Sequence, residues 1–441
     1  MGYQGEEIIF ALSSGIERAA IAIMRVSGLG SAEILRHLCG SLPKPRHAVL
    51  RKLWRDARVQ EEETLLDEAL VLWFPAPRSY TGEDGFELHL HAGPAVIEAV
   101  SEVLVTLGAR PAEAGEFTRR AVQNGRMDLI EAEGIADLIA AETESQRKQA
   151  LAQSKGALSR VYDQWAEKLK TLLAWQEAFI DFPDEELPSH IVEKIHSISR
   201  TLISEMQQHM QEGCKGERVR RGLTFVITGP PNVGKSSLLN WLVQRDAAIV
   251  SSQAGTTRDA LEVVSTLAGV RVTFIDTAGL RETEDIIEAE GVRRALFHVE
   301  QADCIIQMCS ADILPEKVFS NAILVGNKAD IKALPSHYAG HDLIPISLLT
   351  GEGLSCLYTL LEERALALTK SATGMPLLTR ARHEAGVREA CLCLERSLDQ
   401  TLPELCAEEL RLAMQALGRL TGHVGVEDLL EVIFSQFCIG K

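Results

Sequence analysis

The segment 229–236, Gly-Pro-Pro-Asn-Val-Gly-Lys-Ser, combines residue types that bind phosphate groups. It follows the apolar run 223–228 and precedes the helix-like run 237–242. Glycines in such a loop allow backbone N–H groups to surround phosphate oxygens, and the positive end of the following helix adds attraction. Lys235 would neutralise the β and γ phosphates, and the Ser236 hydroxyl would be a ligand of Mg²⁺. The sequence therefore predicts a nucleoside triphosphate site.

Two later segments supply further groups for the metal and the γ-phosphate. Thr256 and Thr257, in the run Gly-Thr-Thr-Arg-Asp, offer hydroxyls to magnesium. Asp276 begins the run Asp-Thr-Ala-Gly directly after an apolar strand predicted at 270–275. A carboxylate and hydroxyls are the oxygen ligands that Mg²⁺ prefers, and Gly279 is placed to sense the γ-phosphate.

The base is predicted to be guanine. Asn327 and Asp330, in the run Asn-Lys-Ala-Asp, follow a strand predicted at 322–325. An aspartate there accepts two hydrogen bonds from the guanine edge, which adenine cannot supply. Ser347 follows a strand predicted at 343–346, where the expected contact is mainly a backbone N–H. The predicted nucleotide contacts are Asn232, Val233, Gly234, Lys235, Ser236, Ser237, Ser251, Ser252, Gln253, Ala254, Gly255, Thr256, Thr257, Asp276, Thr277, Ala278, Gly279, Asn327, Lys328, Asp330, Ser347 and Leu348.

The residue after Asp-Thr-Ala-Gly is Leu280, where Ras-like enzymes place the glutamine that orients the attacking water. A leucine side chain cannot polarise water, so hydrolysis must use another positioned carboxylate or amide, or be slow. Spacing alone does not choose among the acidic residues that follow, which are Glu282, Glu284, Asp285, Glu288 and Glu290.

The elements that must position these groups fall into separate stretches. Residues 1–120 mix patterns, with strands predicted at 21–26, 69–74 and 86–91 and a helix at 95–107. This predicts an α+β domain. The paired histidines of the third strand, His89 and His91, have no third ligand nearby and are predicted to bind no metal.

Helical periodicity begins near residue 127 and runs through 179, followed by a helix predicted at 191–213 and a helix-like segment at 375–437. The arginines between them, Arg218, Arg220 and Arg221, could mark the hinge into the inserted domain, but the favoured prediction is a solvated linker. The predicted fold is α/β plus α, with a discontinuous helical domain that contains an inserted Ras-like P-loop G domain. Its predicted domains are 1–120, 121–216, 217–370 and 371–441.

Composition sets outer limits on function. The 441 residues carry 45 basic and 62 acidic side chains, a net charge of −17. The overall field therefore does not attract nucleic acid, and any RNA contact must be local, shared with a partner or transient. The 46% hydrophobic content argues against disorder as the dominant state, and no apolar run approaches a spanning helix. Nine irregularly spaced cysteines and no basic secretory leader predict reduced thiols in the cytoplasm.

Motifs along nearly the whole chain resemble one family, the tRNA-modification GTPases called MnmE or TrmE, within the TrmE-Era-EngA-YihA-Septin-like class. The most specific match is Cys-Ile-Gly-Lys at 438–441, because it ends a chain that also carries the GTPase motifs. The other matching runs are Tyr-Thr-Gly-Glu-Asp at 80–84, Gly-Glu-Phe-Thr at 115–118, Asn-Gly-Arg-Met-Asp-Leu at 124–129, Glu-Ala-Glu-Gly-Ile-Ala-Asp-Leu at 131–138 and Gly-Thr-Thr-Arg-Asp at 255–259.

The resemblance implies an answer to the missing glutamine. Members of this family dimerise their G domains across K⁺, which stabilises transition-state charge as an arginine finger does. Asn232 matches the potassium-binding asparagine, and Ser251, Gln253 and Thr256 match the other potassium contacts. Glu288 matches the glutamate that orients the attacking water.

The resemblance also implies a tetrahydrofolate site in the first domain, for a 5,10-methylene or 5-formyl derivative. Arg25, Glu87, Arg126 and Lys441 match its positions. Two cations and a carboxylate suit an anionic glutamate tail and a hydrogen-bonding pterin. Judged without the resemblance, Arg25 could simply end a strand and Arg126 could cap a turn. Cys438 could act as a thiolate near the folate or be a structural thiol, whereas lipidation is disfavoured by the terminal lysine.

The function implied is that of a homodimeric, potassium-stimulated GTPase. It would act with a flavin- and NADH-dependent MnmG-type partner, as a heterotetramer, on tRNA. The product would be a 5-aminomethyl or 5-(carboxymethyl)aminomethyl group on the wobble uridine. The alternative is a ribosome-assembly switch GTPase resembling Era or Der, and it leaves the folate-like domain unexplained.

Overall fold

The computed structural model describes most of the chain, in two compact units. One unit contains residues 1–136 and 418–441, and the other contains residues 137–417. None of the helices described is both long and apolar enough to cross a membrane. The described residues are 7–15, 19–181, 189–245, 261–276, 297–371, 374–422, 433–434, 437 and 440.

The first unit contains a six-stranded sheet whose spatial order is β3-β4-β5-β2-β1-β6. Alternate residues of its strands, such as Met24, Val71 and Leu88, are buried against α1 (Ser31–Cys39) and α2 (Pro94–Thr106). This alternation is the expected signature of a sheet with one buried face. The strands are β1 (Ile8–Leu12), β2 (Ile21–Ser27), β3 (Val49–Trp54), β4 (Leu65–Phe74), β5 (Gly85–His91) and β6 (Ala109–Pro111), with a short 3₁₀ helix η1 (Glu62–Thr64) before β4.

The strands predicted at 21–26, 69–74 and 86–91 correspond to β2, β4 and β5. The helix predicted at 95–107 corresponds to α2. These four predictions are confirmed, and β4 extends four residues further toward the N-terminus than its prediction.

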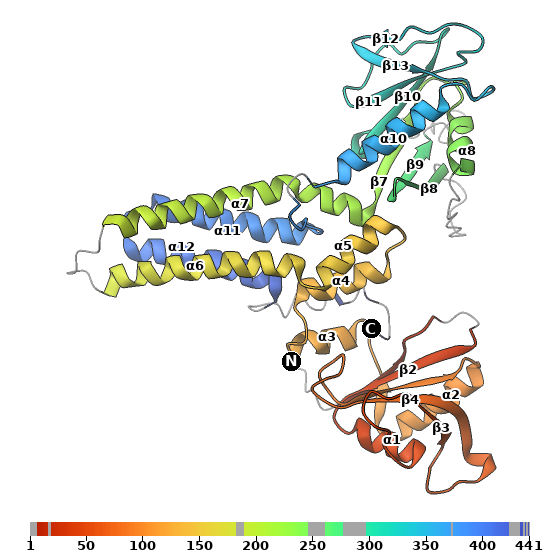
Figure 1. Cartoon of the computed structure of the whole chain (residues 1–441), viewed down its shortest axis with the longest axis vertical. Helices are drawn as coiled ribbons and strands as arrows, with labels where there is room; N and C mark the ends of the chain where they lie inside the picture. Colours follow the sequence, from red (N-terminus) through yellow and green to blue (C-terminus); the bar gives the residue numbers. More distant parts are fainter. Residues whose placement is uncertain are drawn as a thin grey trace, which may run out of the picture. The chain divides into compact units, whose positions relative to one another are not determined.

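The second unit begins with a bundle of long helices. In the bundle α6 (Ala157–Asp181) and α11 (Ala381–Asp399) each lie beside α7 (Ser189–Arg221) (Figure 1). Helix α5 (Glu144–Ser154) starts at a capping box in which Thr143 and Gln146 bond reciprocally. Helices α3 (Glu116–Gln123), α4 (Leu129–Ile139) and α12 (Pro403–Thr421) are also described.

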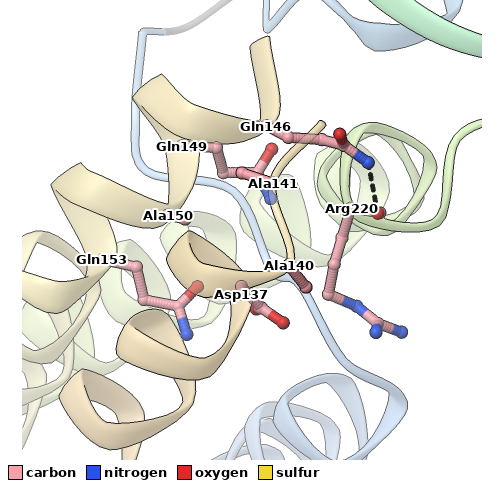
Figure 2. Close-up of a pocket in the computed structure, with 8 residues that line it drawn as sticks. All are labelled: Asp137, Ala140, Ala141, Gln146, Gln149, Ala150, Gln153 and Arg220. Carbon is pink, nitrogen blue, oxygen red and sulfur yellow. Dashed lines mark hydrogen bonds between the residues drawn. The ribbon is translucent and has the colours of Figure 1, made fainter. Parts of the chain in front are cut away.

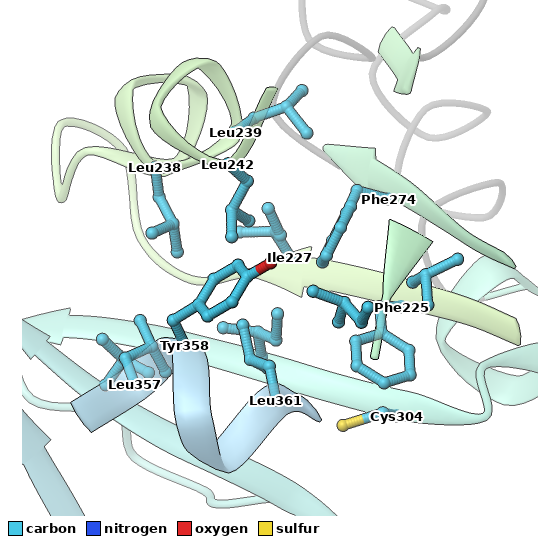
Figure 3. Packing of buried hydrophobic residues seen from close by; sticks show 14 of the residues in the cluster. Phe225, Ile227, Leu238, Leu239, Leu242, Phe274, Cys304, Leu357, Tyr358 and Leu361 are labelled. Carbon is cyan, nitrogen blue, oxygen red and sulfur yellow. The ribbon is translucent and has the colours of Figure 1, made fainter. Parts of the chain in front are cut away.

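The same unit carries a seven-stranded sheet in the order β12-β13-β11-β10-β7-β9-β8. Helices α8 (Lys235–Arg245) and α10 (Leu354–Thr369) contribute Leu238, Leu242 and Leu361 to its core, beside Phe225 and Phe274 (Figure 3). The strands are β7 (Leu223–Thr228), β8 (Leu261–Leu267), β9 (Val270–Asp276), β10 (Cys304–Ser310), β11 (Ala322–Asn327), β12 (His337–Tyr338) and β13 (His341–Pro345).

The prediction that the arginines after residue 217 form a solvated linker is wrong. They lie in the last turn of α7, which continues eight residues beyond its predicted end at residue 213. Arg218 Nε and Arg221 Nη2 donate to Asp303 Oδ1 at 2.8 and 2.9 Å, and Asp303 also accepts from the Thr224 amide at 3.0 Å. This distant carboxylate, just before β10, neutralises the charges of two arginines in the final turn of the helix and joins that turn to β7.

The helix predicted from residue 375 is also wrong at its start, because α11 begins at Ala381. Residues 377–378 instead cross α7 at two glycines. A Cβ on Gly216 would lie 2.1 Å from the Leu378 carbonyl oxygen, and one on Gly213 would lie 2.7 Å from the Leu378 side chain. These two glycines lie inside α7 and permit close packing against it, whereas the sequence analysis placed the end of this helix at Gly213.

An α+β unit, a helical bundle and an α/β sheet are therefore all present. In sequence, β7 through α10 lie between α7 and α11. The domain boundaries near residues 120, 216 and 370 remain predictions.

Candidate functional site

The loop 229–234 lies at the carboxyl end of β7, where the strand order of the sheet reverses between β9 and β10. Ligands bind at such switch points in open α/β sheets. Gly229 has φ of 145°, and a Cβ there would lie 2.3 Å from the Met308 carbonyl oxygen. Gly234 has φ of 101°, and a Cβ there would lie 2.5 Å from Asn327 Nδ2. Both positions therefore require glycine.

Lys235 is the first residue of α8 and is 6% exposed. Its Nζ donates to the carbonyl oxygens of Gly229 and Pro230 at 2.9 and 2.7 Å. The ammonium group thus lies within the loop, held by neutral acceptors that a phosphate can replace. Asn232, exposed on the same loop, has a left-handed φ of 62°, which asparagine tolerates better than most residues.

Ser236 and Asp276 come together from α8 and the end of β9. Ser236 Oγ donates to Asp276 Oδ2 at 2.6 Å, and the Asp276 residue is fully buried. A hydroxyl and a carboxylate so close together are a donor set that suits Mg²⁺. The structure thus pairs the two described residues that were predicted to face the metal.

Asn327 connects the predicted base loops to the phosphate loop. It is 4% exposed, its Nδ2 donates to the Val233 carbonyl oxygen at 2.8 Å, and its Oδ1 accepts from the Leu348 amide at 3.2 Å. Ser347 is buried, and its Oγ accepts from the Thr350 amide at 3.1 Å. Lys328 and Asp330 are exposed beside it. One amide side chain therefore joins three segments far apart in sequence.

Several predicted site residues lie outside the described residues, and their assignments remain predictions. They are Ser251, Ser252, Gln253, Ala254, Gly255, Thr256, Thr257, Thr277, Ala278, Gly279, Leu280, Glu288, Cys438 and Lys441.

In the first unit, Arg25 and Glu87 form an ion pair across β2 and β5. Arg25 Nε and Nη2 each lie 3.0 Å from Glu87 Oε1. The guanidinium also lies 5.1 Å from the ring centre of Tyr80 and 5.8 Å from that of Phe117. The ion pair borders a small cavity of about 100 Å³, which is also lined by Ser79, Tyr80 and Thr81.

Arg126 does not line this cavity. The aliphatic part of its side chain lies beside Gly82, where an added Cβ would be 3.1 Å from Arg126 Cγ. The structure therefore brings Arg25 and Glu87 together and places Arg126 against the loop that supplies one wall.

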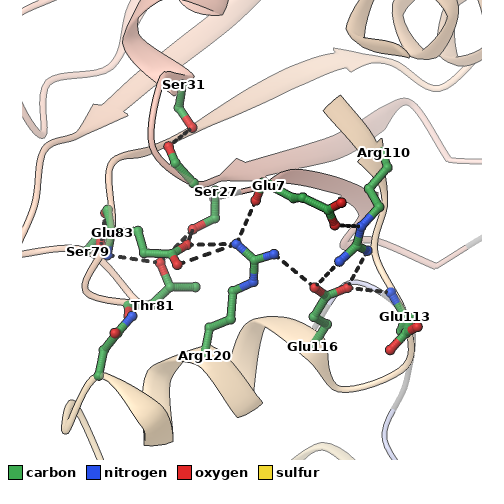
Figure 4. Close-up of polar contacts among 12 residues, drawn as sticks. Glu7, Ser27, Ser31, Ser79, Thr81, Glu83, Arg110, Glu113, Glu116 and Arg120 are labelled. Atoms are coloured by element: carbon green, nitrogen blue, oxygen red, sulfur yellow. Dashed lines mark hydrogen bonds and ion pairs between the residues drawn. The ribbon is translucent and has the colours of Figure 1, made fainter. Parts of the chain in front are cut away.

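Two sequence motifs, 80–84 and 115–118, meet beside this cavity in a buried polar network (Figure 4). Tyr80 Oη lies 2.9 Å from Thr118 Oγ1. Arg120 Nη2 donates to Glu116 Oε1 at 3.0 Å, and Arg120 Nη1 approaches Glu83 Oε2 at 3.3 Å. Burial alone would raise the pKa of Glu116, but bonds from Arg110, the Glu113 amide and Arg120 outweigh it and lower that pKa.

Sequence reasoning missed Tyr80, Phe117 and Arg120 as parts of this site. Both aromatic residues belong to motifs that had been noticed, so their position beside Arg25 could have been suspected. Arg120 lies outside the motifs, and only the fold shows that it is 2% exposed between two carboxylates.

The histidines of β5 have separate partners. His91 Nδ1 lies 2.7 Å from Asp67 Oδ1, and His89 Nε2 lies 3.7 Å from Glu87 Oε2. Within the described part of the chain, no three His, Cys, Asp or Glu side chains are grouped to hold a metal.

Another pocket, of about 100 Å³, lies among the end of α4, α5 and the last turn of α7 (Figure 2). Gln146 Nε2 donates to the Arg220 carbonyl oxygen at 3.0 Å, and Gln149 Nε2 to that of Gly216 at 2.9 Å. These bonds join helices, and no predicted site residue lines the pocket.

The segments that match known proteins cover nearly the entire chain. Residues 129–438 match the family model described as MnmE helical domain, and residues 8–126 match that of the GTP-binding protein TrmE N-terminus. The tRNA modification GTPase MnmE of Gluconacetobacter diazotrophicus is 62% identical over 434 residues, covering 98% of each chain. That of Granulibacter bethesdensis is 52% identical, covering 99% of this chain and 100% of the relative.

A solved structure of Era in complex with MgGDPNP and nucleotides 1506–1542 of 16S ribosomal RNA is 28% identical. It covers 32% of this chain and 56% of that chain with a TM-score of 0.25. The near full-length identity to the two curated relatives and the matches to both family models show that the chain belongs to the MnmE family of tRNA modification GTPases.

Proposed function

We propose that this GTPase is stimulated by potassium and modifies the wobble uridine of tRNAs as a homodimer in the cytoplasm. An MnmG-type flavoprotein with FAD and NADH would be its partner in a heterotetramer. A tetrahydrofolate derivative would supply the carbon of the 5-aminomethyl or 5-(carboxymethyl)aminomethyl group. The observation that carries the proposal is Asn327, which joins the phosphate loop to the guanine loops at one sheet edge.

In the GTPase reaction, Lys235 would exchange its carbonyl partners for the β and γ phosphates. Ser236 Oγ and Asp276 Oδ2 would hold Mg²⁺, directly or through water, and Asp330 would accept from the guanine edge. Bound Mg²⁺ supplies charge neutralisation at the phosphates. Asp276 and Lys235 are both buried, so their charges would act on the phosphates in a site with little water, where electrostatic stabilisation is strong.

Potassium stimulation would depend on Asn232, whose exposed position on the phosphate loop suits a ligand to a cation. Ser251, Gln253 and Thr256 would complete the potassium site. Glu288 would orient the attacking water, because Leu280 cannot.

Support for a homodimer comes from the second face of the six-stranded sheet. Strand register places Leu50, Leu70 and His89 in one row on this face. Leu50 and Ile21, which points to the same face from β2, are 58% and 57% exposed. An apolar row of this kind is typical of an interaction surface, and a second copy of this unit would cover it.

The folate would lie beside the Arg25–Glu87 pair. The guanidinium suits the anionic glutamate tail, and the carboxylate suits the donor groups of the pterin. Tyr80 supplies aromatic surface next to the same arginine, and the fully buried Phe117 ring lies 5.8 Å from the guanidinium. Arg126, Lys441 and Cys438 would complete the site, with the chemistry of Cys438 undecided.

The test is mass spectrometry of tRNA nucleosides from cells that lack this chain, with and without re-expression. Loss of aminomethyl-type wobble uridines, restored by the parent chain, is expected. An unchanged nucleoside profile would remove the modification proposal.

The potassium step has its own test, GTP turnover measured in K⁺ and in Na⁺. Turnover is expected to fall in Na⁺ for the parent and to lose its cation dependence in Asn232→Ala. Asn240→Ala, at an exposed position on α8, is the matched control. Equal turnover of the parent in the two salts would contradict potassium stimulation.

A further inference from the structure

We infer that a basic patch on the first unit, formed by Lys44, Arg46 and Arg78, binds the phosphate backbone of RNA. The inference rests on the proposed function, because tRNA is the polyanion that this chain would handle. The patch is a local exception in a chain whose net charge is −17. A local positive surface is therefore needed if the chain itself contacts RNA.

The patch is built by a turn and by the loop after β4. The His47 amide donates to the Lys44 carbonyl oxygen at 3.2 Å, which closes a turn over Pro45 and Arg46. The Arg46 amide donates to the Trp73 carbonyl oxygen at 2.9 Å, so the turn is anchored to β4. These two bonds present the Lys44 and Arg46 side chains beside the end of that strand.

Arg46 occupies a backbone conformation in which glycine or asparagine is favoured. Its φ is 59°, at the second central position of the turn, where a residue with a Cβ is disfavoured by about 1 kcal/mol. The arginine side chain reaches the next loop, where Nη2 donates to the Arg78 carbonyl oxygen at 2.8 Å. An unfavourable backbone that presents a cation suggests a use for that cation.

Arg46 and Arg78 lie beside each other, and Lys44 is two residues from Arg46 in the same turn. All three side chains are exposed, and none forms an ion pair within the part of the chain that the structure describes. The acids of the same loop accept hydrogen bonds from other groups. Asp84 Oδ1 accepts from the Ala76 amide at 2.8 Å, and Glu83 Oε2 accepts from Ser27 at 2.8 Å. Neighbouring like charges repel unless an anion binds between them.

The patch shares the loop after β4 with residues that line the candidate folate cavity. Arg78 is bonded directly to Ser79, which lines that cavity with Tyr80 and Phe74. A phosphate group held by Arg78 would thus lie near a residue that lines the cavity. This position suits a nucleotide that must meet a one-carbon donor.

The side-chain types favour phosphates over an acidic protein surface. Two guanidinium groups can each bind a phosphate through paired N–H groups, and the lysine adds a mobile charge. No large aromatic side chain is exposed among residues 44–47 and 75–78 to form an apolar anchor, as a protein interface would have. Phosphate contacts alone position RNA without reading its sequence.

The test uses the full chain and fluorescein-labelled unfractionated tRNA, with anisotropy titrations between 50 and 200 mM KCl. The variant Lys44→Gln/Arg46→Gln/Arg78→Gln is expected to bind at least about tenfold more weakly at the lowest salt. It should also reduce the slope of log Kobs against log salt by roughly 2 to 3. The variant Lys44→Arg/Arg46→Lys/Arg78→Lys should restore most of that slope, since it keeps the charges.

The matched control removes three exposed lysines of the helical bundle, Lys148→Gln/Lys155→Gln/Lys170→Gln, with the same change in net charge. Equal affinity and slope for the two Gln variants would overturn the inference, as would absence of salt-dependent tRNA binding by the parent. Loss of flavoprotein association with unchanged tRNA binding would assign the patch to a protein instead. Nucleoside profiles report the proposed function separately, because a normal profile in cells lacking the chain would leave patch-dependent RNA binding intact.

Discussion

The nucleotide site and the Arg25–Glu87 site hold their charged groups in opposite ways. Lys235 is bonded to two backbone carbonyls and Asp276 to the Ser236 hydroxyl, which are neutral partners. In the first unit, by contrast, Arg25 pairs with Glu87, and buried Glu116 pairs with arginines. Neutral partners can be exchanged at low cost, whereas breaking a buried ion pair leaves an uncompensated charge. The difference indicates that the nucleotide site rearranges during its cycle and the other site stays preorganised.

The largest effect is expected from a substitution that removes the ammonium group of Lys235. Lys235→Ala should lower GTP turnover by on the order of 1,000-fold, because transition-state charge on the phosphates loses its partner. The folded state should be little affected, since the Gly229 and Pro230 carbonyl oxygens that accept from Lys235 can bond to water instead. The measurement is single-turnover GTP hydrolysis, with thermal unfolding alongside. Lys332→Ala, at an exposed lysine paired with Asp312, is the control. A large drop in the unfolding temperature of Lys235→Ala would contradict the interpretation that the partners of Lys235 are exchanged at low cost.

Glu116→Gln should destabilise the first unit by roughly 3 kcal/mol, because Arg110 and Arg120 lose a buried counter-charge. Hydrogen exchange in β1 and α3 measures the effect. Glu113→Gln, whose side chain is 65% exposed, is the control. The folded pKa of Glu116 is lowered, so its carboxylate contributes stability above its unfolded pKa of roughly 4.3. That contribution is lost as the pH falls through the folded pKa, and Glu116→Gln should lack this acid dependence.

Asn327→Ala should weaken GTP binding by about 30-fold, since two loops lose a shared bond and the Val233 carbonyl loses a donor. Calorimetric titration with a non-hydrolysable GTP analogue provides the measurement. Asn321→Ala, at an exposed asparagine before β11, is the matched control. An affinity equal to that of the control would show that the loops are aligned without this bridge.

The smallest effect is expected from a substitution that keeps the positive charge and changes the hydrogen-bonding geometry of the side chain. Arg25→Lys should weaken 5-formyl-tetrahydrofolate binding by about tenfold, because an ammonium group lacks the planar fork and ring contacts of the guanidinium. Equilibrium dialysis measures the affinity, and GTP turnover should not change. Arg36→Lys, in an exposed pair with Glu33, is the control. Unchanged folate affinity would mean that charge alone suffices there, which would remove the contrast between the two sites.

Local patterns predicted the described elements that hold the nucleotide site. The loop 229–236 and the run ending at Asp330 carry their chemistry in contiguous residues, and strands β7, β9 and β11 are short apolar runs directly before them. What could not be predicted was the role of Asn327 as a bridge, because its partners Val233 and Leu348 are remote in sequence.

The same reason explains the two errors in helix boundaries. The end of α7 depends on Asp303, which lies 82 residues beyond Arg221 in the chain. The start of α11 depends on how residues 377–378 pack against Gly213 and Gly216. Intrinsic propensity is a weak predictor wherever a distant partner decides the local structure.

The Asp303 contacts have a mechanical consequence. Only Gly222 separates the 33-residue helix α7 from β7, the strand that leads into the phosphate loop. Asp303 bonds both to the final turn of the helix and to the Thr224 amide of the strand, so we expect a rotation of one to be passed to the other. With a rise of 1.5 Å per residue, α7 is a lever arm of about 50 Å. A tilt of about 5° at the strand would then displace the far end of α7 by roughly 4 Å.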